Sequence, residues 1–583
     1  MKKMEKEILI GDSKLLTSNN AITGSFEDIN GESFYKIANY HQMDPFFMTI
    51  VSNSDHWMFI SSNGAVTAGR KNPDIALFPY YTVDKIQDSA EISGSKTILL
   101  VDREDRSFLW EPFSDKYNGV YDIQRNIYKS VYGNKVLFEE INNGLGITFS
   151  YMWMNSEKYG FIKKSTVTNN LDAACNISLI DGIQNILPAG IDRLLQLSYS
   201  NLVDAYKKNE LVTGTTIGLF MLSSVIVDKA EPSEALKTTV VWSDGLENAN
   251  ILLSARQLNN FRKGLPVETE IDVRATRGAY FLHKEISIAG NNKKVWHIVA
   301  EVNKNAGYIA TLKHFIKDSI HIAQELNNDV VDCTKGLVNI LAAADGLQLT
   351  ADKLSENRHL SNVLFNAMRG GIFDDNYSIA KQDLLQFISG ANKTVYSNNS
   401  SFLEALASTI DYPVLLKEAT IHGDKQLIRL CYEYMPLAFS RRHGDPSRPW
   451  NLFAIEMKKE DGKKNLNYQG NWRDIFQNWE ALALSFPSFT ESMICKFVNA
   501  STADGYNPYR ITREGIDWEA PDPHDPWANI GYWGDHQVIY LQKFLEISKR
   551  YHPGALNKML TENIFAYANV PYRIKPYSDL VKN

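Results

Sequence analysis

The chain has 583 residues, which is enough for two or three domains with well-formed hydrophobic cores. Hydrophobic residues make up 44% and charged residues 22%, and the net charge of −7 comes without any long basic run. These values exclude nucleic acid and anionic membrane as main partners, because both bind clustered lysine and arginine.

The cysteines and the N-terminus indicate a reducing compartment. Four cysteines lie far apart and form no Cys-x-x-Cys pair, so we expect neither a disulfide framework nor a structural zinc site. The N-terminal run MKKMEKEILIGDSK is basic but lacks the apolar stretch of a signal peptide. No run approaches the roughly 20 apolar residues of a membrane span. We therefore predict a cytoplasmic protein.

Residues 1–304 show the pattern of β structure. Apolar and polar residues alternate, and Asn63-Gly64 and Asn143-Gly144 mark hairpin turns in which both residues tolerate a positive φ. The predicted strands include KTILLVD, RSFLWEPF, KVLFEEINNGLGITFSYMWM, ALKTTVVWSD, VETEIDVRAT and KKVWHIVAEV. So many short strands predict a large antiparallel β-sandwich.

After residue 304 the apolar spacing becomes helical. We predict a helical linker over 305–335 and a helical domain over 336–583. Its helices include FLEALASTI, KQLIRLCYEYMPLAF, RDIFQNWEALALSF, FTESMICKFV and HQVIYLQKFLEISKRY. Long polar stretches separate them, and loops of such length are usually functional. The alternative is two unrelated domains, one β and one α.

The stretch Gly470-Asn471-Trp472-Arg473-Asp474-Ile475-Phe476-Gln477-Asn478-Trp479-Glu480 is the first candidate for a binding site. On a helix, Arg473, Gln477 and Glu480 share one face, with Asp474 beside them. Carboxylates and amides bind pairs of hydroxyls, and Trp472 could cover the apolar face of a sugar ring. The alternative is a solvated helix start with Asp474 in its first turn.

An acidic and aromatic loop follows over 514–527, with five acids interleaved with Trp and Pro. Such a rigid loop suits the wall of a sugar pocket, and one of its acids could serve as a general acid or base. The candidates are Asp517, Glu519 and Asp525. The alternative is an exposed acidic loop with bound calcium, although its spacing is not that of an EF-hand.

Two further stretches carry candidate residues. Tyr532-Trp533-Gly534-Asp535 precedes a predicted helix, with Asp535 in the position of an N-cap. The loop over 440–450 holds three arginines and a histidine, of which Arg441, Arg442 and His443 could bind phosphate. We favour the alternative in which these arginines pair with the acidic loop. No serine-nucleophile, phosphate-loop or His-Glu-x-x-His motif occurs.

In order, these elements resemble the cellobiose and chitobiose phosphorylases of glycoside hydrolase family 94 and the related β-glucan phosphorylase families. The Arg-Asp-x-x-Gln-Asp motif of that family is matched by Arg473-Asp474-Ile475-Phe476-Gln477-Asn478, with Asn478 in place of the last acid. The Ser-Asp-Asp motif of that family is matched at Asp535 only. The resemblance implies an N-terminal β-sandwich, a helical linker and the first part of an (α/α)6 barrel.

The resemblance also implies the chemistry. Inverting phosphorolysis of a β-linked glucoside, oligosaccharide or disaccharide would give an α-sugar 1-phosphate, with inorganic phosphate as co-substrate and no metal or organic cofactor. Arg473, Asp474, Gln477 and Asp535 would hold the donor sugar, and Trp472, Trp527 and Trp533 would flank sugar rings. Family members are commonly homodimers.

In the family, the general acid lies in a Trp-Asn-Asp type motif on a later barrel loop than the segments matched above. The resemblance therefore covers only the first part of the barrel, and we expect the barrel of this chain to be incomplete. We therefore expect a second polypeptide that completes the barrel, or a truncated or non-catalytic carbohydrate-binding homologue. A further alternative is an inverting hydrolase that uses an acid of the 514–525 loop.

Overall fold

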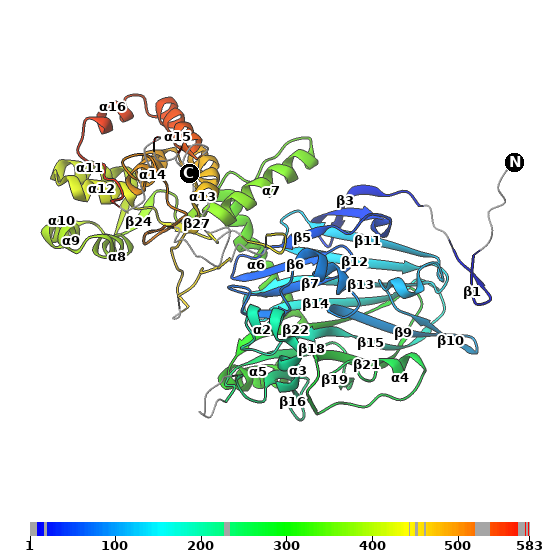
Figure 1. Cartoon of the computed structure of the whole chain (residues 1–583). Coiled ribbons are helices and arrows are strands. Elements are labelled where there is room, and N and C mark those ends of the chain that lie inside the picture. Colours follow the sequence, from blue (N-terminus) through cyan, green and yellow to red (C-terminus); the bar gives the residue numbers. More distant parts are fainter. Residues whose placement is uncertain are drawn as a thin grey trace. The chain divides into compact units, whose positions relative to one another are not determined.

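The structure is a computed structural model, and it describes residues 8–16, 20–226, 234–441, 444–448, 453–459, 462–518, 537–569, 578 and 581. The chain forms two compact units (Figure 1). Residues 1–337 and 444–452 form the β-rich unit, and residues 338–443 and 453–583 form the helical unit.

The largest element of the β-rich unit is an antiparallel sheet of 11 strands. Its strands lie in the order β20 (Asp272–Arg274), β16 (Lys207–Leu211), β17 (Gly218–Leu222), β18 (Thr238–Asp244), β22 (Lys293–Lys304), β14 (Gly160–Asn169), β13 (Ile147–Ser156), β12 (Lys135–Asn142), β11 (Ile123–Ser130), β4 (Glu32–Ala38) and β3 (Thr23–Ile29).

A second sheet of five strands supplies the other layer of the core. Its order is β10 (Arg106–Trp110), β9 (Gly94–Arg103), β15 (Cys175–Ile186), β21 (Gly278–Ile288) and β19 (Asn250–Leu252). Smaller sheets contain β5 (Phe47–Ile50), β6 (His56–Ser61), β7 (Val66–Arg70) and β8 (Ala76–Phe78), and β1 (Leu9–Ile10) with β2 (Ser13–Lys14).

Short helices connect these strands, and two longer helices follow the last one. The short helices are η1 (Tyr40–Gln42), α1 (Val83–Asp88), η2 (Asp115–Tyr117), α2 (Arg193–Ser198), α3 (Ser200–Tyr206) and α4 (Leu258–Arg262). The longer ones are α5 (Ala306–Asp318) and α6 (Ile322–Ala343).

The core of the β-rich unit forms because alternate residues of each strand face the same side. In β13, Ile147, Phe149, Tyr151 and Trp153 are all buried, and they join Leu99 of β9 and Leu179 of β15 in one hydrophobic cluster. The strands predicted from alternation are therefore present, in two layers that pack against each other. The predicted strand VETEIDVRAT is the least accurate, because only Asp272–Arg274 pairs.

The two predicted hairpins are confirmed, but their turns differ from the expected geometry. Asn63-Gly64 lies between β6 and β7, and the φ of Gly64 alone is positive, at 89°. Asn143-Gly144 lies between β12 and β13, where the positive φ falls on Gly146 instead, at 62°. Longer loops require only one left-handed residue, which explains the difference.

A fully buried ion pair lies inside the sandwich. Lys163 of β14 and Asp181 of β15 have no exposed side-chain surface, and Nζ lies 2.5 Å from Oδ1. The Asp181 carboxylate also accepts hydrogen bonds from Thr97 Oγ1 (2.6 Å), Ser165 Oγ (2.8 Å) and Trp296 Nε1 (2.8 Å). These donors offset the desolvation of the carboxylate, so the pair is compatible with a stable core.

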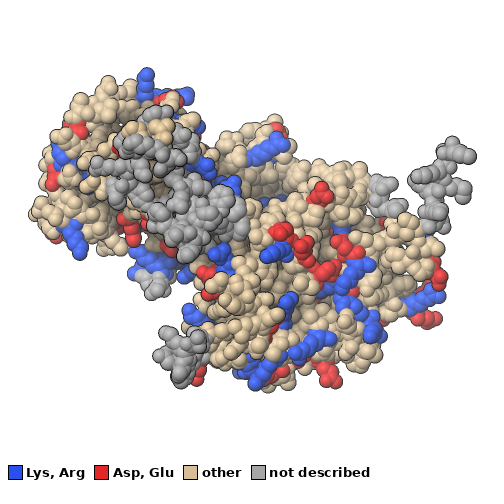
Figure 2. Space-filling view, in the orientation of Figure 1, with Lys and Arg blue, Asp and Glu red and all other residues tan. Residues whose placement is uncertain are grey.

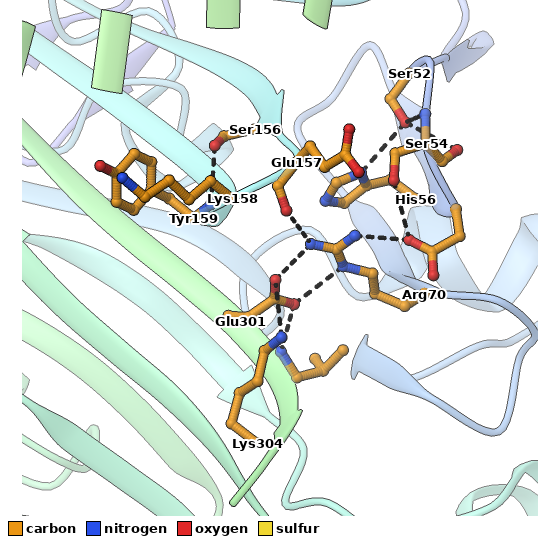
Figure 3. A network of polar contacts seen from close by, with 12 residues as sticks. Ser52, Ser54, His56, Arg70, Ser156, Glu157, Lys158, Tyr159, Glu301 and Lys304 are labelled. Atoms are coloured by element: carbon orange, nitrogen blue, oxygen red, sulfur yellow. Dashed lines mark hydrogen bonds and ion pairs between the residues drawn. The ribbon is translucent and has the colours of Figure 1, made fainter. Parts of the chain in front are cut away.

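A second polar network surrounds Arg70 at the end of β7 (Figure 3). Its guanidinium pairs with Asp55 at 2.6 Å and with Glu301 of β22, and donates to the carbonyl of Glu157 at 3.2 Å. His56 lies beside it, with Nδ1 3.2 Å from Ser52 Oγ. Burial, aided by the charge of Arg70, lowers the pKa of His56 well below its ordinary value.

The helical unit contains the remaining helices of the described ranges, in chain order. They are α7 (Lys353–Gly370), α8 (Lys381–Ala391), α9 (Lys393–Asn398), α10 (Ser400–Ala405), α11 (Tyr412–His422), α12 (Lys425–Glu433), α13 (Trp472–Ser485), η3 (Pro487–Phe489), α14 (Thr490–Ala500), α15 (Val538–Tyr551) and α16 (Ala555–Leu560). Short strand pairs join β23 (Ile372–Phe373) to β26 (Leu437–Ala438), and β24 (Ser378–Ala380) to β25 (Thr409–Asp411).

Helices α7 and α13 pack closely because α7 ends in glycine. Trp479 Nε1 donates to the carbonyl of Gly370 at 2.7 Å. A Cβ on Gly370 would lie 3.0 Å from the Cβ of Asn478, so a larger residue would push the helices apart. The predicted helices over 425–439 and 402–410 are shorter than expected, because each ends before a paired strand, β26 and β25 respectively. The (α/α)6 barrel stays a prediction.

Charged side chains of both signs lie on the surface of the β-rich unit (Figure 2), and no described helix fits a membrane span. Figure 2 shows basic and acidic side chains interspersed over the visible face of the β-rich unit. Among the helices in the described ranges, none combines the length and apolar character needed to cross a bilayer.

Candidate functional site

The candidate site is built on a small sheet that leads directly into α13. Strand β27 (Gln469–Asn471) pairs with β28 (Arg510–Thr512), which pairs with β29 (Ile516–Asp517). The backbone N–H of Trp472, the first residue of α13, donates to the carbonyl of Tyr509 at 2.9 Å. The sheet therefore fixes where α13 begins.

Arg473, Asp474 and Gln477 occupy the first two turns of α13, as predicted. The side chains of Arg473 and Asp474 are 47% and 15% exposed, and Arg473 Nη2 lies 3.8 Å from Asp474 Oδ1. Gln477 is exposed one turn further along. Asp474 lies in the first turn, where the helix dipole favours a carboxylate. These three side chains can donate and accept hydrogen bonds at the helix start.

Trp472 does not present the ring face that the stacking role requires. It is fully buried, and its ring centroid lies 4.7 Å from that of Phe476 and 4.9 Å from that of Phe497. The indole belongs to the aromatic core beneath the helix start, since tryptophan buries more apolar surface than any other residue. Trp472 therefore packs in the core beneath the helix start and has no exposed ring face.

Glu480, which the helical spacing places near Gln477, has a different partner. Its carboxylate lies 2.8 Å from Lys543 Nζ of α15, and both side chains are partly exposed. The hydrogen bond to Glu480 raises the pKa of Lys543 above its ordinary value. Glu480 therefore ties α13 to α15.

Three buried polar atoms near the helix start lack a partner within the described part of the chain. They are Asn471 Oδ1, Trp472 Nε1 and Arg510 Nε. Asn471 and Arg510 are directly opposite each other in the pairing of β27 with β28, so their side chains lie on one face of the sheet. Unpaired buried polar atoms mark places where ordered water or a ligand completes the hydrogen bonding.

Sequence reasoning did not single out Arg510, which lies in a long polar loop with no motif around it. The pairing of β28 with β27 is what brings it to Asn471, and that pairing has no signature in the sequence. The side-chain amide of Gln537, just before α15, is also buried, and its oxygen and nitrogen lack partners within the described ranges. Gln537 lies two residues after Asp535, and this position was the one feature of the sequence that indicated a role for Gln537 at the site.

The acidic loop is described only at its start. Asp517 lies in β29 with its side chain 55% exposed, and Oδ2 lies 3.2 Å from Arg510 Nη1. The ring of Trp518 stacks on Tyr506 with centroids 6.2 Å apart. Asp517 therefore borders the Asn471–Arg510 pair. Glu519, Asp525, Trp527, Trp533 and Asp535 lie outside the described residues.

Of the three residues that could bind phosphate, the structure describes Arg441 alone. Arg442 and His443 lie outside the described residues. The backbone N–H of Arg441 donates to the carbonyl of Met368 at 2.7 Å. Its Nη2 lies 2.9 Å from the sulfur of the same methionine. These contacts place Arg441 at the C-terminal part of α7.

A groove of about 310 Å³ lies beside α13 but contains none of the predicted sugar-binding residues. Its lining includes Asn362 and Asn366 of α7 and Asn478 and Ser485 of α13. Asn478 replaces the last acid of the family 94 motif, and its side-chain amide donates to the carbonyl of Asp474. Asn478 thus stabilises the helix backbone and lines the groove.

Comparison of the sequence with protein families gives one match in the helical unit. The model of glycoside hydrolase family 149 insertion domain 1 matches residues 373–436, which lie between the paired strands β23 and β26. No curated protein matches the chain. The family match supports a carbohydrate-active protein of the glycoside hydrolase or phosphorylase type. It does not single out family 94.

Solved structures that resemble the chain do so at low identity. A bacterial glucoamylase complexed with acarbose has 11% identity and a TM-score of 0.37, with 83% of this chain and 60% of that chain covered. A putative kojibiose phosphorylase from the human microbiome has 10% identity and a TM-score of 0.29, with coverages of 90% and 69%. A family GH92 alpha-mannosidase from Bacteroides thetaiotaomicron has 8% identity and a TM-score of 0.28, with coverages of 86% and 71%. At these TM-scores none of the likenesses supports a functional conclusion.

Proposed function

We propose that the chain binds a β-linked gluco-oligosaccharide at the start of α13 and takes part in its inverting phosphorolysis. The observation that carries the proposal is the group formed by Arg473, Asp474 and Gln477. These side chains share the first two turns of one helix, and Asp474 meets only Arg473 among the partners that the structure describes. Their hydrogen-bonding capacity is therefore available to a ligand with neighbouring hydroxyl groups.

In the proposed reaction, a carboxylic acid protonates the glycosidic oxygen while phosphate attacks the anomeric carbon from the opposite face. The bond to the leaving sugar breaks as the bond to the phosphate oxygen forms, which inverts the configuration and gives an α-sugar 1-phosphate. Asp474 and Gln477 would accept from and donate to hydroxyls of the donor sugar. Arg473 would orient Asp474. No organic cofactor or metal is part of the proposal.

A product assay tests the reaction. The protein purified from its source, together with any polypeptide that co-purifies with it, is incubated with phosphate and either cellobiose or laminaribiose, and glucose 1-phosphate and free glucose are measured. Glucose 1-phosphate that forms only with phosphate supports the proposal. Two molecules of glucose per disaccharide, formed without phosphate, would instead support an inverting hydrolase that uses an acid of the 514–525 loop. Sugar binding with neither product would leave a non-catalytic binding protein.

The proposal includes a partner, because the residues that we assign bind the donor sugar and include no general acid. We propose that a second polypeptide supplies the acid and the phosphate site. Native mass spectrometry of the protein purified from its source tests this. A hetero-oligomer with phosphorolytic activity supports it. An active monomer or homodimer of this chain alone would contradict it.

A further inference from the structure

The carboxylate of Asp383 joins two distant parts of the helical unit. Asp383 lies in the first turn of α8, within the segment matched by the family 149 insertion domain. Its Oδ2 accepts a hydrogen bond from the Tyr434 hydroxyl at 2.7 Å and another from Arg513 Nη2 at 2.5 Å. Both charged side chains are largely buried, so the ion pair is shielded from solvent.

Arg513 uses its other groups to hold the chain just before β27. Its Nη1 donates to the carbonyl of Leu466 at 2.5 Å, and its backbone N–H donates to the carbonyl of Tyr468 at 3.0 Å. Arg513 follows β28 directly, so these bonds extend the pairing of β27 with β28 by one more residue. The Asp383 carboxylate therefore fixes the residue that holds β27 and β28 together at this end of their pairing.

A second contact links α8 to the same place. The ammonium of Lys496 on α14 lies 5.5 Å from the ring centroid of Phe387 on α8 and 5.7 Å from that of Tyr468. Lys496 is buried, and a buried cation between two aromatic rings is held by both. Tyr468 in turn packs on Trp479 of α13 at a centroid distance of 5.3 Å.

These contacts end at the candidate sugar site. Strand β27 passes without a break into α13, so a shift at Leu466 or Tyr468 is carried to Arg473 and Asp474. A displacement of roughly 1 Å in a binding group lowers catalytic efficiency by about 100-fold. We infer that the segment 373–436 positions the sugar site, and that Asp383 is the residue through which it acts. The inference rests on the proposed function and makes Asp383 a positioning residue.

The fold of the segment itself does not depend on this carboxylate. Phe373 and Tyr412 stack on Phe489 with centroid distances of 3.7 and 4.1 Å. These aromatic contacts keep the segment packed against η3 and α14 when the ion pair is removed. The variant Asp383→Asn, which is nearly the same size, therefore changes the contact with Arg513 and leaves the packing in place.

The first test is amide hydrogen exchange, measured without sugar. In Asp383→Asn we expect amides of residues 466–474 to exchange about tenfold faster, because the local opening free energy falls when a charged hydrogen bond is lost. The control is Lys425→Gln, which removes the exposed ion pair between Lys425 and Glu562 from the same segment. Unchanged exchange of residues 466–474 in Asp383→Asn, or equal acceleration in both variants, would overturn the inference.

The second test is sugar affinity, measured with cellobiose and laminaribiose by calorimetry. We expect about tenfold weaker binding in Asp383→Asn and in Arg513→Gln, and no further loss in the double variant, since both act through one contact. If active, the variants should show a raised KM with kcat changed less. Faster exchange with unchanged affinity would overturn the inference. If the wild type binds neither sugar, the proposed function fails, and the exchange data still decide whether Asp383 holds the segment 466–474 in place.

Discussion

Two clusters of buried polar groups, one in each unit, differ in how their hydrogen-bonding capacity is used. In the β-rich unit, the Asp181 carboxylate meets Lys163 and three further donors. At the start of α13, Asn471 Oδ1, Trp472 Nε1 and Arg510 Nε meet no partner within the described ranges. A buried polar group left unpaired costs about 1–3 kcal/mol. The first cluster therefore serves the stability of the fold, and the second is organised for water or a ligand.

The largest effect is expected from breaking the saturated cluster. Asp181→Asn leaves Lys163 buried without its counter-charge, and burial already lowers the pKa of Lys163. We expect the β-rich unit to lose about 3–5 kcal/mol of unfolding free energy. Urea unfolding followed by circular dichroism measures this loss. The control Asp332→Asn removes the exposed pair with Lys335 and should leave the midpoint unchanged. Equal midpoints in both variants would contradict the assignment.

At the start of α13 we expect a loss of sugar binding with little loss of stability. Asp474→Ala removes a carboxylate whose described side-chain partner, Arg473, lies 3.8 Å away, so the free energy of unfolding should change far less than in Asp181→Asn. Sugar affinity should fall about 10- to 150-fold, because a hydrogen bond to a charged group contributes about 1.5–3 kcal/mol, and turnover should be lost. Calorimetry with cellobiose and laminaribiose measures the sugar affinity. Glu480→Gln on the same helix is the matched control, since Glu480 is already committed to Lys543. Wild-type affinity in Asp474→Ala would rule the site out.

The smallest effect is a pH dependence in the β-rich unit. His56 is buried and its pKa lies well below the ordinary value in the folded protein, so the unfolded chain binds a proton from about pH 6.5 downward before the folded chain does. Stability should therefore fall by about 1.4 kcal/mol per pH unit as the pH drops below 6.5, until His56 is protonated in the folded state. The slope between pH 6.5 and 5, measured by urea unfolding, should be reduced in His56→Phe. A slope that is the same in both proteins would mean that His56 is not the titrating group.

The strands of the β-rich unit were predictable because alternation of apolar and polar residues is a local signal. KTILLVD corresponds to β9 and KKVWHIVAEV to β22, and each has one face in the core. Loop geometry was less predictable, as the positive φ at Gly146 instead of Gly144 shows. The φ of a turn residue depends on the register of the flanking strands, which no local pattern specifies.

The site was predictable as a helix start and not as a three-dimensional arrangement. The positions of Arg473, Asp474 and Gln477 on α13 follow from helical spacing. The burial of Trp472 does not, because it depends on Phe497 from a later helix. In the same way, Asp383 is unremarkable in sequence, and its contact with Arg513 arises from tertiary packing of distant segments. Long-range contacts of this kind leave no period or motif in the chain.

The pairing of β23 with β26 has a consequence for how this protein could have been assembled. Ile372 pairs with Ala438 and Phe373 with Leu437, so the two ends of the segment 373–436 lie at neighbouring positions within the helical unit. A segment whose ends are only about 5 Å apart can be gained, lost or exchanged by recombination without moving α7 or α13. The ion pair of Asp383 with Arg513 restricts which segments could replace this one. A replacement segment would have to place a carboxylate at the same position beside Arg513.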